Sequence, residues 1–306
     1  MAFAVEVMIP AYGDGPLIRD AIRSVIDQDD KDWKLTIVDD AAGFEHGEMA
    51  SWLRTLADSR ISYLANPQRL GINRNFQRCV DVSSADWVIV LGADDRLLPN
   101  CISQVRRTIA DFAEVAWIHT GAIVIDRHGR PHKSMADRVK KLTAPKVGGR
   151  RVIGGEQLAV TLLRGNWMYF PSCAFRREVL QRIGFRVDYD IVLDLDLYLR
   201  ILLDGGSCVL LERPGIEYRR HSASLSSTGA DDGSRFAEEG RYFEKTATVM
   251  TLAGWPRAAT AARQHWASRL HAAASVPSVL VNHHWRAAMA LARFAVSTPS
   301  RRPPNC

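Results

Sequence analysis

Residues 4–40 read AVEVMIPAYGDGPLIRDAIRSVIDQDDKDWKLTIVDD, and this stretch decides the fold class. The short apolar run Ala4–Ile9 ends at Pro10 and predicts a strand. From Leu17 to Ile26, apolar residues recur at i, i+1, i+4, i+5, i+8 and i+9, which is the pattern of one helix face. Trp33–Val38 predicts a second strand. A strand, a helix and a strand in this order are typical of a parallel α/β sheet.

The same alternation continues along the first third of the chain. Strands are expected at Ile61–Ala65 and Trp87–Leu91, and helices around Glu45–Ala57 and Ile72–Val82. The segment Trp87–Leu91 is nearly all apolar, as expected of a strand that is covered on both faces. We therefore expect an α/β fold with a parallel sheet, in which a ligand binds at the carboxyl ends of the strands.

The remainder of the chain has a more mixed pattern. Helices are expected at Gly155–Arg164, Arg176–Ile183 and Asp194–Asp204, and strands within Val115–Asp126, at Ser207–Leu211 and at Ile216–Arg220. Arg138–Gly155 is rich in Lys, Arg and Gly and predicts a mobile loop, while Ser222–Ser234 predicts a lid or a linker. From Arg235 onward the pattern is helical, with breaks expected at Trp255-Pro256 and Val276-Pro277.

The composition is that of an ordinary globular protein, with 47% hydrophobic and 24% charged residues among 306. This excludes a disordered, collagenous or coiled-coil chain. The net charge of +6 is uneven, because no acidic residue follows Glu244 while the segment 246–306 contains seven arginines. Residues 1–245 therefore carry 33 basic against 34 acidic residues. Without a basic excess in this main part, nucleic-acid binding is not expected.

The five cysteines are widely spaced and form no CxxC pair, which predicts neither a zinc site nor a disulfide framework. Met1–Pro10 lacks the basic region and the cleavage site of a signal peptide. No apolar run approaches the ~20 residues that a membrane span needs. We expect a cytoplasmic protein.

Polar side chains follow each of the first four expected strands. They are Tyr12 with Asp14, Asp39 with Asp40, Asn66 with Arg69, and Asp94 with Asp95. Neither GxGxxG after the first strand nor GxxxxGK[ST] occurs, which argues against a Rossmann dinucleotide enzyme and a P-loop NTPase. Taken singly, Tyr12 is also explained as a packing residue and the Asp39-Asp40 pair as a cap or a solvated loop.

Two carboxylate clusters are candidates for a role in metal binding or catalysis. Leu91–Asp95, LGADD, brings two carboxylates to the sheet edge, where hard oxygen ligands suit Mg²⁺ or Mn²⁺ with substrate phosphates. The alternative is a cap on the helix expected near Pro99. Asp194 and Asp196 lie two residues apart, so only one of them faces a given site, where a carboxylate is a natural general base. The alternative is one capping Asp and one Asp paired with Arg200.

The order and spacing of these motifs resemble the inverting GT-A glycosyltransferases of family 2. The likeness runs from Val5 to about Ser226. The matching segments are Val7–Tyr12, Ile37–Ala42, Asn66–Asn75, Leu91–Asp95, Arg176–Phe185, Leu193–Arg200 and Tyr218–Ser226. The resemblance implies a GT-A fold, with a Rossmann-like, mostly parallel central sheet flanked by helices and followed by a C-terminal helical extension.

The resemblance also implies roles for single residues. The backbone near Pro10 and Ala11 and the ring of Tyr12 would hold the nucleotide base, with Asp39 on the base edge and Arg69 near the base or the diphosphate. Other roles fall on residues further along the chain. Asp94 would bind Mn²⁺ or Mg²⁺ with Asp95 beside it, Asp194 would be the general base, and His221, with Arg219, would reach the diphosphate or the metal from a closing loop.

The acceptor side is less defined by the sequence. Trp167 and Tyr169 lie where family members build the acceptor pocket and could stack on a sugar, although ordinary core aromatics are an equal alternative. By resemblance, residues 1–98 would bind the nucleotide sugar and residues 99–228 would complete the same GT-A domain with the acceptor and catalytic half. Residues 229–306 would form the helical extension.

The implied reaction moves a sugar from a nucleotide-diphosphate sugar, with UDP favoured, to a hydroxyl of a saccharide or a lipid-linked acceptor. Gly92 stands where the family usually has the first Asp of its metal motif, which keeps open a nucleotide-sugar binding protein with weak or no transferase activity. A sugar-phosphate nucleotidyltransferase is a weaker alternative, because it needs a basic residue in the loop after the first strand and none precedes Arg19.

The C-terminal tail lies outside the resemblance. Its tryptophans and Phe294 are interspersed with arginines, which is compatible with peripheral contact at the inner face of an anionic membrane. The alternative, which the sequence favours, is a helical cap on the enzyme.

Overall fold

A computed structural model describes residues 5–13, 15–40, 48–132, 134–220, 234–281 and 285–296. Contacts divide the chain into two units. The first unit contains the sheet and comprises Met1–Lys133, Lys146–Gly154 and Met168–Arg220. The second unit contains helices and comprises Ser134–Pro145, Gly155–Trp167 and His221–Cys306.

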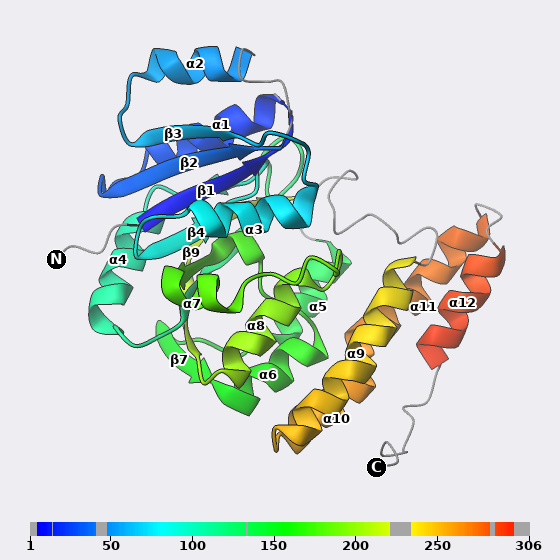
Figure 1. The fold of residues 1–306 in the computed structure, drawn as a ribbon. Coiled ribbons are helices and arrows are strands. Elements are labelled where there is room, and N and C mark those ends of the chain that lie inside the picture. Colours follow the sequence, from blue (N-terminus) through cyan, green and yellow to red (C-terminus); the bar gives the residue numbers. More distant parts are fainter. Residues whose placement is uncertain are drawn as a thin grey trace. The chain divides into compact units, whose positions relative to one another are not determined.

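The first half of the sheet is parallel and follows the predicted alternation (Figure 1). Its strands are β1 (Val5–Ala11), β2 (Trp33–Asp39), β3 (Ile61–Ala65) and β4 (Trp87–Val90), in the order β3-β2-β1-β4. Its helices are α1 (Pro16–Ile26), α2 (Glu48–Leu56) and α3 (Ile72–Val82). These elements confirm the strands and helices predicted from the apolar periodicity. The part of the second predicted helix before residue 48 lies outside the described residues.

The second half of the sheet is mixed. The strand β8 (Cys173–Arg176) lies antiparallel between β4 and β6 (Trp117–Ile125), and β9 (Ser207–Arg219) runs parallel to β6. Two further strands, β5 (Arg96–Leu97) and β7 (Arg150–Gly154), pair antiparallel with β9. The α/β fold class is confirmed, with parallel pairing concentrated in the first half and mixed pairing in the second.

The strand β9 joins two segments that the sequence predicts as separate strands. The pairing register of β9 with β6 shifts on both sides of Gly121, which marks a bulge opposite Pro214. A Cβ atom at Gly121 would lie 2.8 Å from the carbonyl oxygen of Glu212. The missing side chain therefore lets the two backbones approach, and the chain continues past Pro214 without ending the strand.

The predicted mobile loop Arg138–Gly155 is wrong, because it contains most of α5 (Met135–Thr143) and the whole of β7. The helix α5 begins with a capping box, in which the Ser134 hydroxyl accepts from the backbone of Asp137 and the Asp137 carboxylate accepts from the backbone of Ser134. The backbone of β7 is paired with β9. Terminal hydrogen bonds and edge pairing thus order a segment whose charged composition resembles that of a loop.

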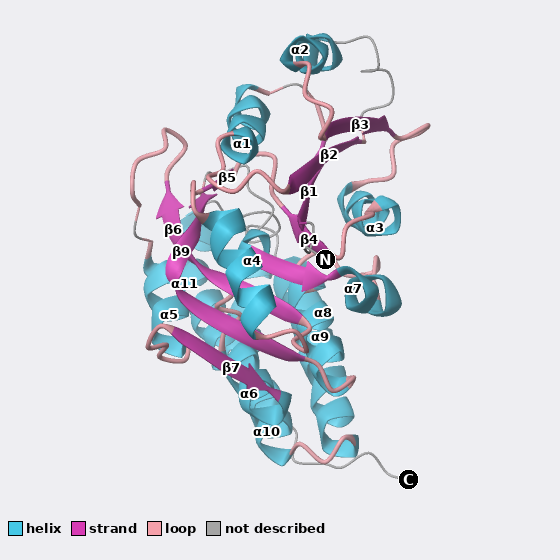
Figure 2. Cartoon of the chain, turned by 90° about the vertical axis from the view of Figure 1, so that its left-hand side faces the viewer, coloured by secondary structure: helices cyan, strands magenta, loops and turns pink. Residues whose placement is uncertain are grey.

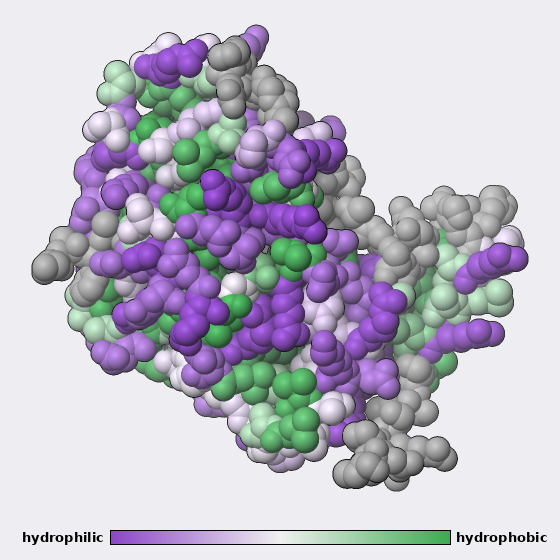
Figure 3. Space-filling view, in the orientation of Figure 1, coloured by the Kyte–Doolittle hydropathy of each residue, from purple (hydrophilic) through white to green (hydrophobic). Residues whose placement is uncertain are grey.

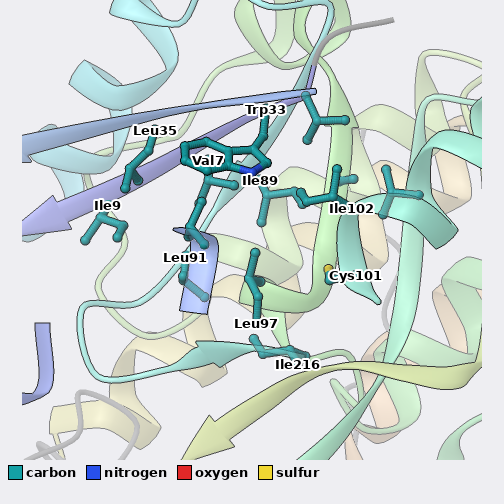
Figure 4. Close-up of a cluster of buried hydrophobic side chains, with 14 of the residues drawn as sticks. Val7, Ile9, Trp33, Leu35, Ile89, Leu91, Leu97, Cys101, Ile102 and Ile216 are labelled. Atoms are coloured by element: carbon teal, nitrogen blue, oxygen red, sulfur yellow. The ribbon is translucent and has the colours of Figure 1, made fainter. Parts of the chain in front are cut away.

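Helices cover both faces of the sheet in the first unit (Figure 2). The helices α1 and α4 (Cys101–Asp111) share a buried core with β1, β2 and β4, while α3 and α7 (Arg177–Ile183) lie on the other face. Figure 4 shows the shared core, which includes Val7, Leu35 and Ile89 at no more than 2% exposure. Burying each such side chain stabilises the fold by about 1.5–3 kcal/mol. The core therefore holds the strands in position, and with them the residues at the strand ends.

The second unit is helical in its described part. Besides α5 it contains α6 (Gly155–Arg164), α9 (Ser234–Leu252), α10 (Pro256–Gln264), α11 (Trp266–Val281) and α12 (Trp285–Val296). The predicted break at Trp255-Pro256 is confirmed, since Pro256 opens α10. The predicted break at Val276-Pro277 is wrong, because Pro277 lies inside α11 four residues before its end, where the missing N–H removes a single hydrogen bond.

Two predictions concern the lid or linker and the membrane-spanning segments. The predicted lid or linker lies outside the described residues up to residue 233, and Ser234 begins α9. Among the helices that the structure describes, none combines the length and the apolar character required to cross a membrane.

Candidate active site

The carboxyl ends of four strands meet at one edge of the sheet. In the parallel pairing of β1 with β2, Ala11 lies beside Asp39, and Asp39 lies beside Ala65 of β3. The strand β4 pairs in parallel with β1, with Val90 beside Met8. The polar residues that follow these strands are therefore gathered at the same edge, as the sequence predicts.

Tyr12 and Arg69 are brought into contact at this edge. The Arg69 guanidinium carbon lies 4.4 Å from the centroid of the Tyr12 ring, which is a cation–π arrangement. The Tyr12 side chain remains 61% exposed. An exposed aromatic ring held by a cation offers a planar ligand both a stacking surface and positive charge.

Asp39 is buried at the end of β2. Its Oδ2 accepts a hydrogen bond from the hydroxyl of Tyr63 at 2.5 Å, and its backbone carbonyl accepts from the backbone N–H of Asn66 at 2.8 Å. The neighbouring strand β3 thus supplies the hydroxyl that orients this carboxylate.

Asp40 has a role that sequence reasoning missed. Its Oδ1 accepts from the backbone N–H of Leu70 at 2.6 Å and from the side chain of Asn66 at 3.0 Å, and its Oδ2 accepts from the backbone N–H of Gly71 at 2.7 Å. Asn75 extends the network, accepting from Asn66 at 2.9 Å and donating to the carbonyl of Val38. The carboxylate of Asp40 therefore holds the loop that carries Arg69, and the two asparagines of the motif are the pattern that could have indicated it.

Asp40→Asn should lower the free energy of unfolding by about 2 kcal/mol, because an amide NH₂ group would face a buried backbone N–H and leave it unsatisfied. Denaturant unfolding measures this difference. Asp81→Asn is the matched control, since Asp81 is exposed and accepts an exposed hydrogen bond from the side chain of Gln77. Equal stability of the two variants would show that Asp40 does not hold the loop.

Arg219, the last residue of β9, holds the turn that contains Asp94 and Asp95. Its backbone N–H donates to Asp95 at 2.8 Å, and its Nε donates to the carbonyl of Asp94 at 2.6 Å. Its Nη1 donates to the carbonyls of Asp126 and Arg127. The side chain is buried and spans backbone groups, so it supports the turn from inside, which differs from the predicted contact with a diphosphate.

The two carboxylates of this turn have different surroundings. Asp95 is only 2% exposed, and burial, together with the adjacent Asp94 carboxylate, raises the pKa of Asp95 well above its usual range. Asp94 is half-buried and thus the more accessible of the pair.

Asp194 and Asp196 in α8 (Leu193–Leu203) are clearly distinguished. Asp196 is buried and accepts from Arg200 at 2.7 Å, so the pairing with Arg200 that the alternative interpretation gives to one of the two residues is made by Asp196. Asp194 is half-buried in the first helical turn, and its Oδ1 accepts from the backbone N–H of Leu195 at 2.7 Å. Of the two, Asp194 is the carboxylate that remains accessible.

The charge of Asp194 acts on a residue of β8. Burial and, to a smaller degree, the charge of Asp194 raise the pKa of the Cys173 thiol to about 12. Cys173 begins β8, and the next residue, Ala174, pairs with Ile89 near the carboxyl end of β4. The charge of Asp194 therefore acts on the end of β8 that adjoins the carboxyl end of β4.

The two predicted acceptor aromatics have different environments. The rings of Tyr169 and Tyr218 lie 4.8 Å apart between centroids, and Tyr218 directly precedes Arg219 in the chain. Trp167 belongs to the second unit, is buried, and donates its indole N–H to Thr161 at 3.2 Å. A buried ring presents little face to a sugar, so Tyr169 is the better candidate. His221 lies outside the described residues.

The sequence of residues 6–184 matches the profile of Glycosyl transferase family 2. The chain belongs to this family. It is a glycosyltransferase, and the matched region extends from β1 to the end of α7. The match thus includes Tyr12, Asp39, Arg69 and Asp94 and ends before α8.

Relatives of this glycosyltransferase occur among curated proteins. An uncharacterized protein of Mycobacterium tuberculosis is 28% identical over 232 residues, which cover 73% of this chain and 69% of the relative. The GalNAc(5)-diNAcBac-PP-undecaprenol beta-1,3-glucosyltransferase of Campylobacter jejuni is 27% identical over 136 residues, which cover 44% of this chain and 42% of that enzyme.

Solved structures share the fold at low sequence identity. TarS residues 1–349 of S. aureus, in complex with UDP-GlcNAc, align with a TM-score of 0.61 and 10% identity over 96% of this chain and 91% of that chain. The mannosyltransferase PcManGT of Pyrobaculum calidifontis, in complex with GDP-Man and Mn²⁺, aligns with a TM-score of 0.55 and 15% identity over 97% of this chain and 87% of that chain. These alignments confirm the GT-A fold of this family 2 chain.

A divalent cation fits the Asp94 turn only if a ligand completes the site. No group of three or more His, Cys, Asp or Glu side chains able to hold a metal occurs within the described part of this glycosyltransferase. Mg²⁺ and similar cations are commonly bound by one or two carboxylates together with substrate phosphates. The half-buried Asp94 suits such a shared site, whereas Asp95 is engaged by Arg219.

Gly92 opens the turn that contains Asp94 and Asp95. A Cβ atom at this position would lie 2.6 Å from Oδ2 of Asp95. The carboxylate of Asp95 therefore occupies the space that a side chain at position 92 would need.

Gly92→Ala should lower the free energy of unfolding by about 2 kcal/mol and weaken donor binding, because Asp95 must turn away and release the backbone of Arg219. Denaturant unfolding and calorimetry measure the two effects. Gly148→Ala is the control, since a Cβ atom there meets nothing within 4 Å. If both variants have the stability and the donor affinity of the wild type, the position of the Asp95 carboxylate does not require a glycine at position 92.

Proposed function

We propose that this glycosyltransferase moves a sugar from a nucleoside-diphosphate sugar, preferably a UDP-sugar, to a hydroxyl of a saccharide or lipid-linked acceptor, with inversion at the anomeric carbon. The observation that carries the proposal is the meeting of Tyr12, Asp39 and the Asp94 turn at one edge of the sheet. A base, a diphosphate and a sugar can extend along that edge in this order.

The nucleotide end of the donor is assigned to Tyr12, Arg69 and Asp39. The exposed ring of Tyr12 stacks on the base, and Arg69 contributes positive charge beside it. Asp39 accepts a hydrogen bond from an N–H group on the base edge. The Tyr63 hydroxyl keeps the Asp39 carboxylate in place, so that little side-chain freedom is lost when the base binds.

Asp94 would hold Mn²⁺ or Mg²⁺ together with the donor diphosphate, and the bound cation would neutralise charge on the leaving group. Arg219 contributes by fixing the backbone of Asp94. Because Arg219 is itself anchored on Asp126 and Arg127, the turn is held before the donor arrives. His221 remains a proposed contact to the diphosphate.

Asp194 is the proposed general base. As the acceptor oxygen forms its bond to the anomeric carbon, the bond from that carbon to the diphosphate oxygen breaks, and the acceptor proton moves to the Asp194 carboxylate. Attack from the face opposite the leaving group inverts the configuration. The hydrogen bond from the backbone of Leu195 keeps the carboxylate oriented at the start of α8.

The acceptor class is proposed from the relatives. The Campylobacter jejuni relative is a glucosyltransferase named for a polyprenyl-diphosphate-linked saccharide, which supports a lipid-linked acceptor here. The two aligned structures carry UDP-GlcNAc and GDP-Man, which supports a nucleotide-sugar donor. Tyr169, beside Tyr218, is the aromatic proposed to stack on an acceptor sugar.

Incubation of the full chain with UDP-, GDP- and dTDP-sugars and Mn²⁺ tests the proposal. We expect slow release of the free nucleoside diphosphate from at least one donor, and loss of this release when the cation is chelated. Formation of pyrophosphate from a sugar phosphate and a nucleoside triphosphate would indicate a nucleotidyltransferase. Binding without release in the presence of candidate acceptors would favour a binding protein, the alternative that Gly92 raises.

A further inference from the structure

The helix α12 has two apolar faces, of which one is packed within the part of the chain that the structure describes. Ala288 and Leu291 are buried in a core with Phe236, Ala272 and Val279 of the same unit. On another side of the helix, Trp285, Met289, Ala292 and Val296 follow one another at i, i+4, i+7 and i+11 and are all exposed. These four residues are called the α12 stripe below.

The exposure of the α12 stripe is extensive. Trp285, Met289 and Val296 are 62%, 56% and 77% exposed. Single exposed apolar residues are common on soluble proteins, but a continuous helical stripe that includes a tryptophan marks an interaction surface. Figure 3 shows apolar and weakly apolar surface over α11 and α12, interrupted by hydrophilic side chains. The helix α11 adds exposed Leu270 and Val281.

Positive charge borders the α12 stripe. Arg286 and Arg293 are exposed and lie seven residues apart, so that they share one side of α12 next to the stripe. No acidic residue occurs in the chain after Glu244, so neither α11 nor α12 carries a negative charge. An apolar stripe with arginines along its border is complementary to a surface that has an apolar layer beneath an anionic layer.

We propose that the α12 stripe lies in the surface of an anionic lipid bilayer, with Trp285 and Met289 at the boundary between headgroups and acyl chains and the arginines on lipid phosphates. The helix has 12 residues. It is therefore about 18 Å long, against about 30 Å for the hydrocarbon core, which suits a helix lying along the interface. This surface would bring a lipid-linked acceptor to the enzyme, a consequence that rests on the proposed function.

Charge favours a bilayer over a second copy of the chain. In a symmetric dimer the same patch meets itself, so Arg286 and Arg293 of both copies would be brought together. Neither α11 nor α12 offers a carboxylate to pair with them. Anionic phospholipids supply many phosphates at such a surface, and each arginine near it strengthens binding about fivefold.

Sedimentation with vesicles tests the proposal on the full chain without any donor. We expect binding to vesicles that contain phosphatidylglycerol and much weaker binding to pure phosphatidylcholine. Arg286→Gln with Arg293→Gln should weaken binding about 25-fold, since two charges are removed. Arg257→Gln on α10, also exposed, is the control that changes charge within the same unit.

The apolar contribution is tested in the same assay. Trp285→Gln with Met289→Gln should weaken vesicle binding by at least about tenfold. Leu252→Gln is the matched control, because Leu252 is 83% exposed at the end of α9, away from the α12 stripe in sequence. Circular dichroism and nucleoside-diphosphate release in the absence of vesicles show that each variant is folded.

Three results would overturn the membrane proposal. They are equal binding to neutral and anionic vesicles, no binding to either, and a wild-type dimer in light scattering that becomes monomeric in the Trp285 variant. Failure of the proposed function has a separate readout, because vesicle binding is measured without a donor and donor hydrolysis without vesicles.

Discussion

Asp194→Asn should lower the rate of sugar transfer by about 10²–10⁴-fold and leave donor binding unchanged. The amide preserves the size and the position of the side chain at the start of α8, where Oδ1 accepts from Leu195, but it cannot take the proton of the acceptor hydroxyl. Steady-state kinetics with saturating donor give the turnover, and calorimetry gives the donor affinity. Transfer by Asp194→Asn at a near-normal rate would exclude this residue as the base.

Two neighbouring carboxylates provide controls for this experiment. Asp188 is exposed shortly before α8, so Asp188→Asn should retain both stability and turnover. Asp196 is buried against Arg200, so Asp196→Asn should destabilise the fold by about 3 kcal/mol, because it weakens a buried ion pair. A loss of turnover without a loss of stability is thus expected for Asp194 alone among the three.

Asp94→Ala should weaken binding of the donor in the presence of Mn²⁺ by at least about 100-fold. Removal of a residue that merely supports a metal ligand costs about 10- to 100-fold in metal affinity, and Asp94 is assigned as a direct ligand. Titration calorimetry with and without Mn²⁺ measures the difference. In buffer without a divalent cation, the variant and the wild type should bind the donor equally weakly.

Asp27→Ala is the control for the Asp94 experiment. Asp27 is exposed at the end of α1 and lies outside the Asp94 turn, so its removal changes the charge of the unit without altering the turn. Unchanged donor affinity of Asp94→Ala in Mn²⁺ would remove the metal site from this turn.

The inner strands β1 and β4 of the parallel half were predictable because they are covered on both faces. Such strands are continuous apolar runs, as in β4, whose four residues are all buried. The predicted bounds of the edge strand Ile61–Ala65 and of the helix Ile72–Val82 also match the structure. The mixed half depends on long-range pairing. Pro214 and Gly215 indicate the end of a strand, yet Gly121 on the neighbouring strand leaves room for a bulge, and β9 continues. No local pattern contains that information.

The sequence predicted which residue types lie at the strand ends. It predicted less well which contacts each of these residues makes. Asp39 and Asp40 are adjacent, and the sequence does not show that Asp39 accepts from Tyr63 while Asp40 binds the backbone of the Arg69 loop. Arg219 has the charge expected of a phosphate ligand, but burial turns it toward backbone carbonyls. These differences arise from the direction in which a side chain leaves the backbone.

The central claim is tested most directly by soaking a crystal of the chain with Mn²⁺ and the donor that the hydrolysis assay identifies. The anomalous scattering of manganese then locates the cation. The predicted result is one manganese peak in direct coordination with Asp94 and the diphosphate, with the base stacked on Tyr12 and its edge on Asp39. A manganese peak or a nucleotide bound away from the carboxyl ends of β1, β2 and β4 would contradict it.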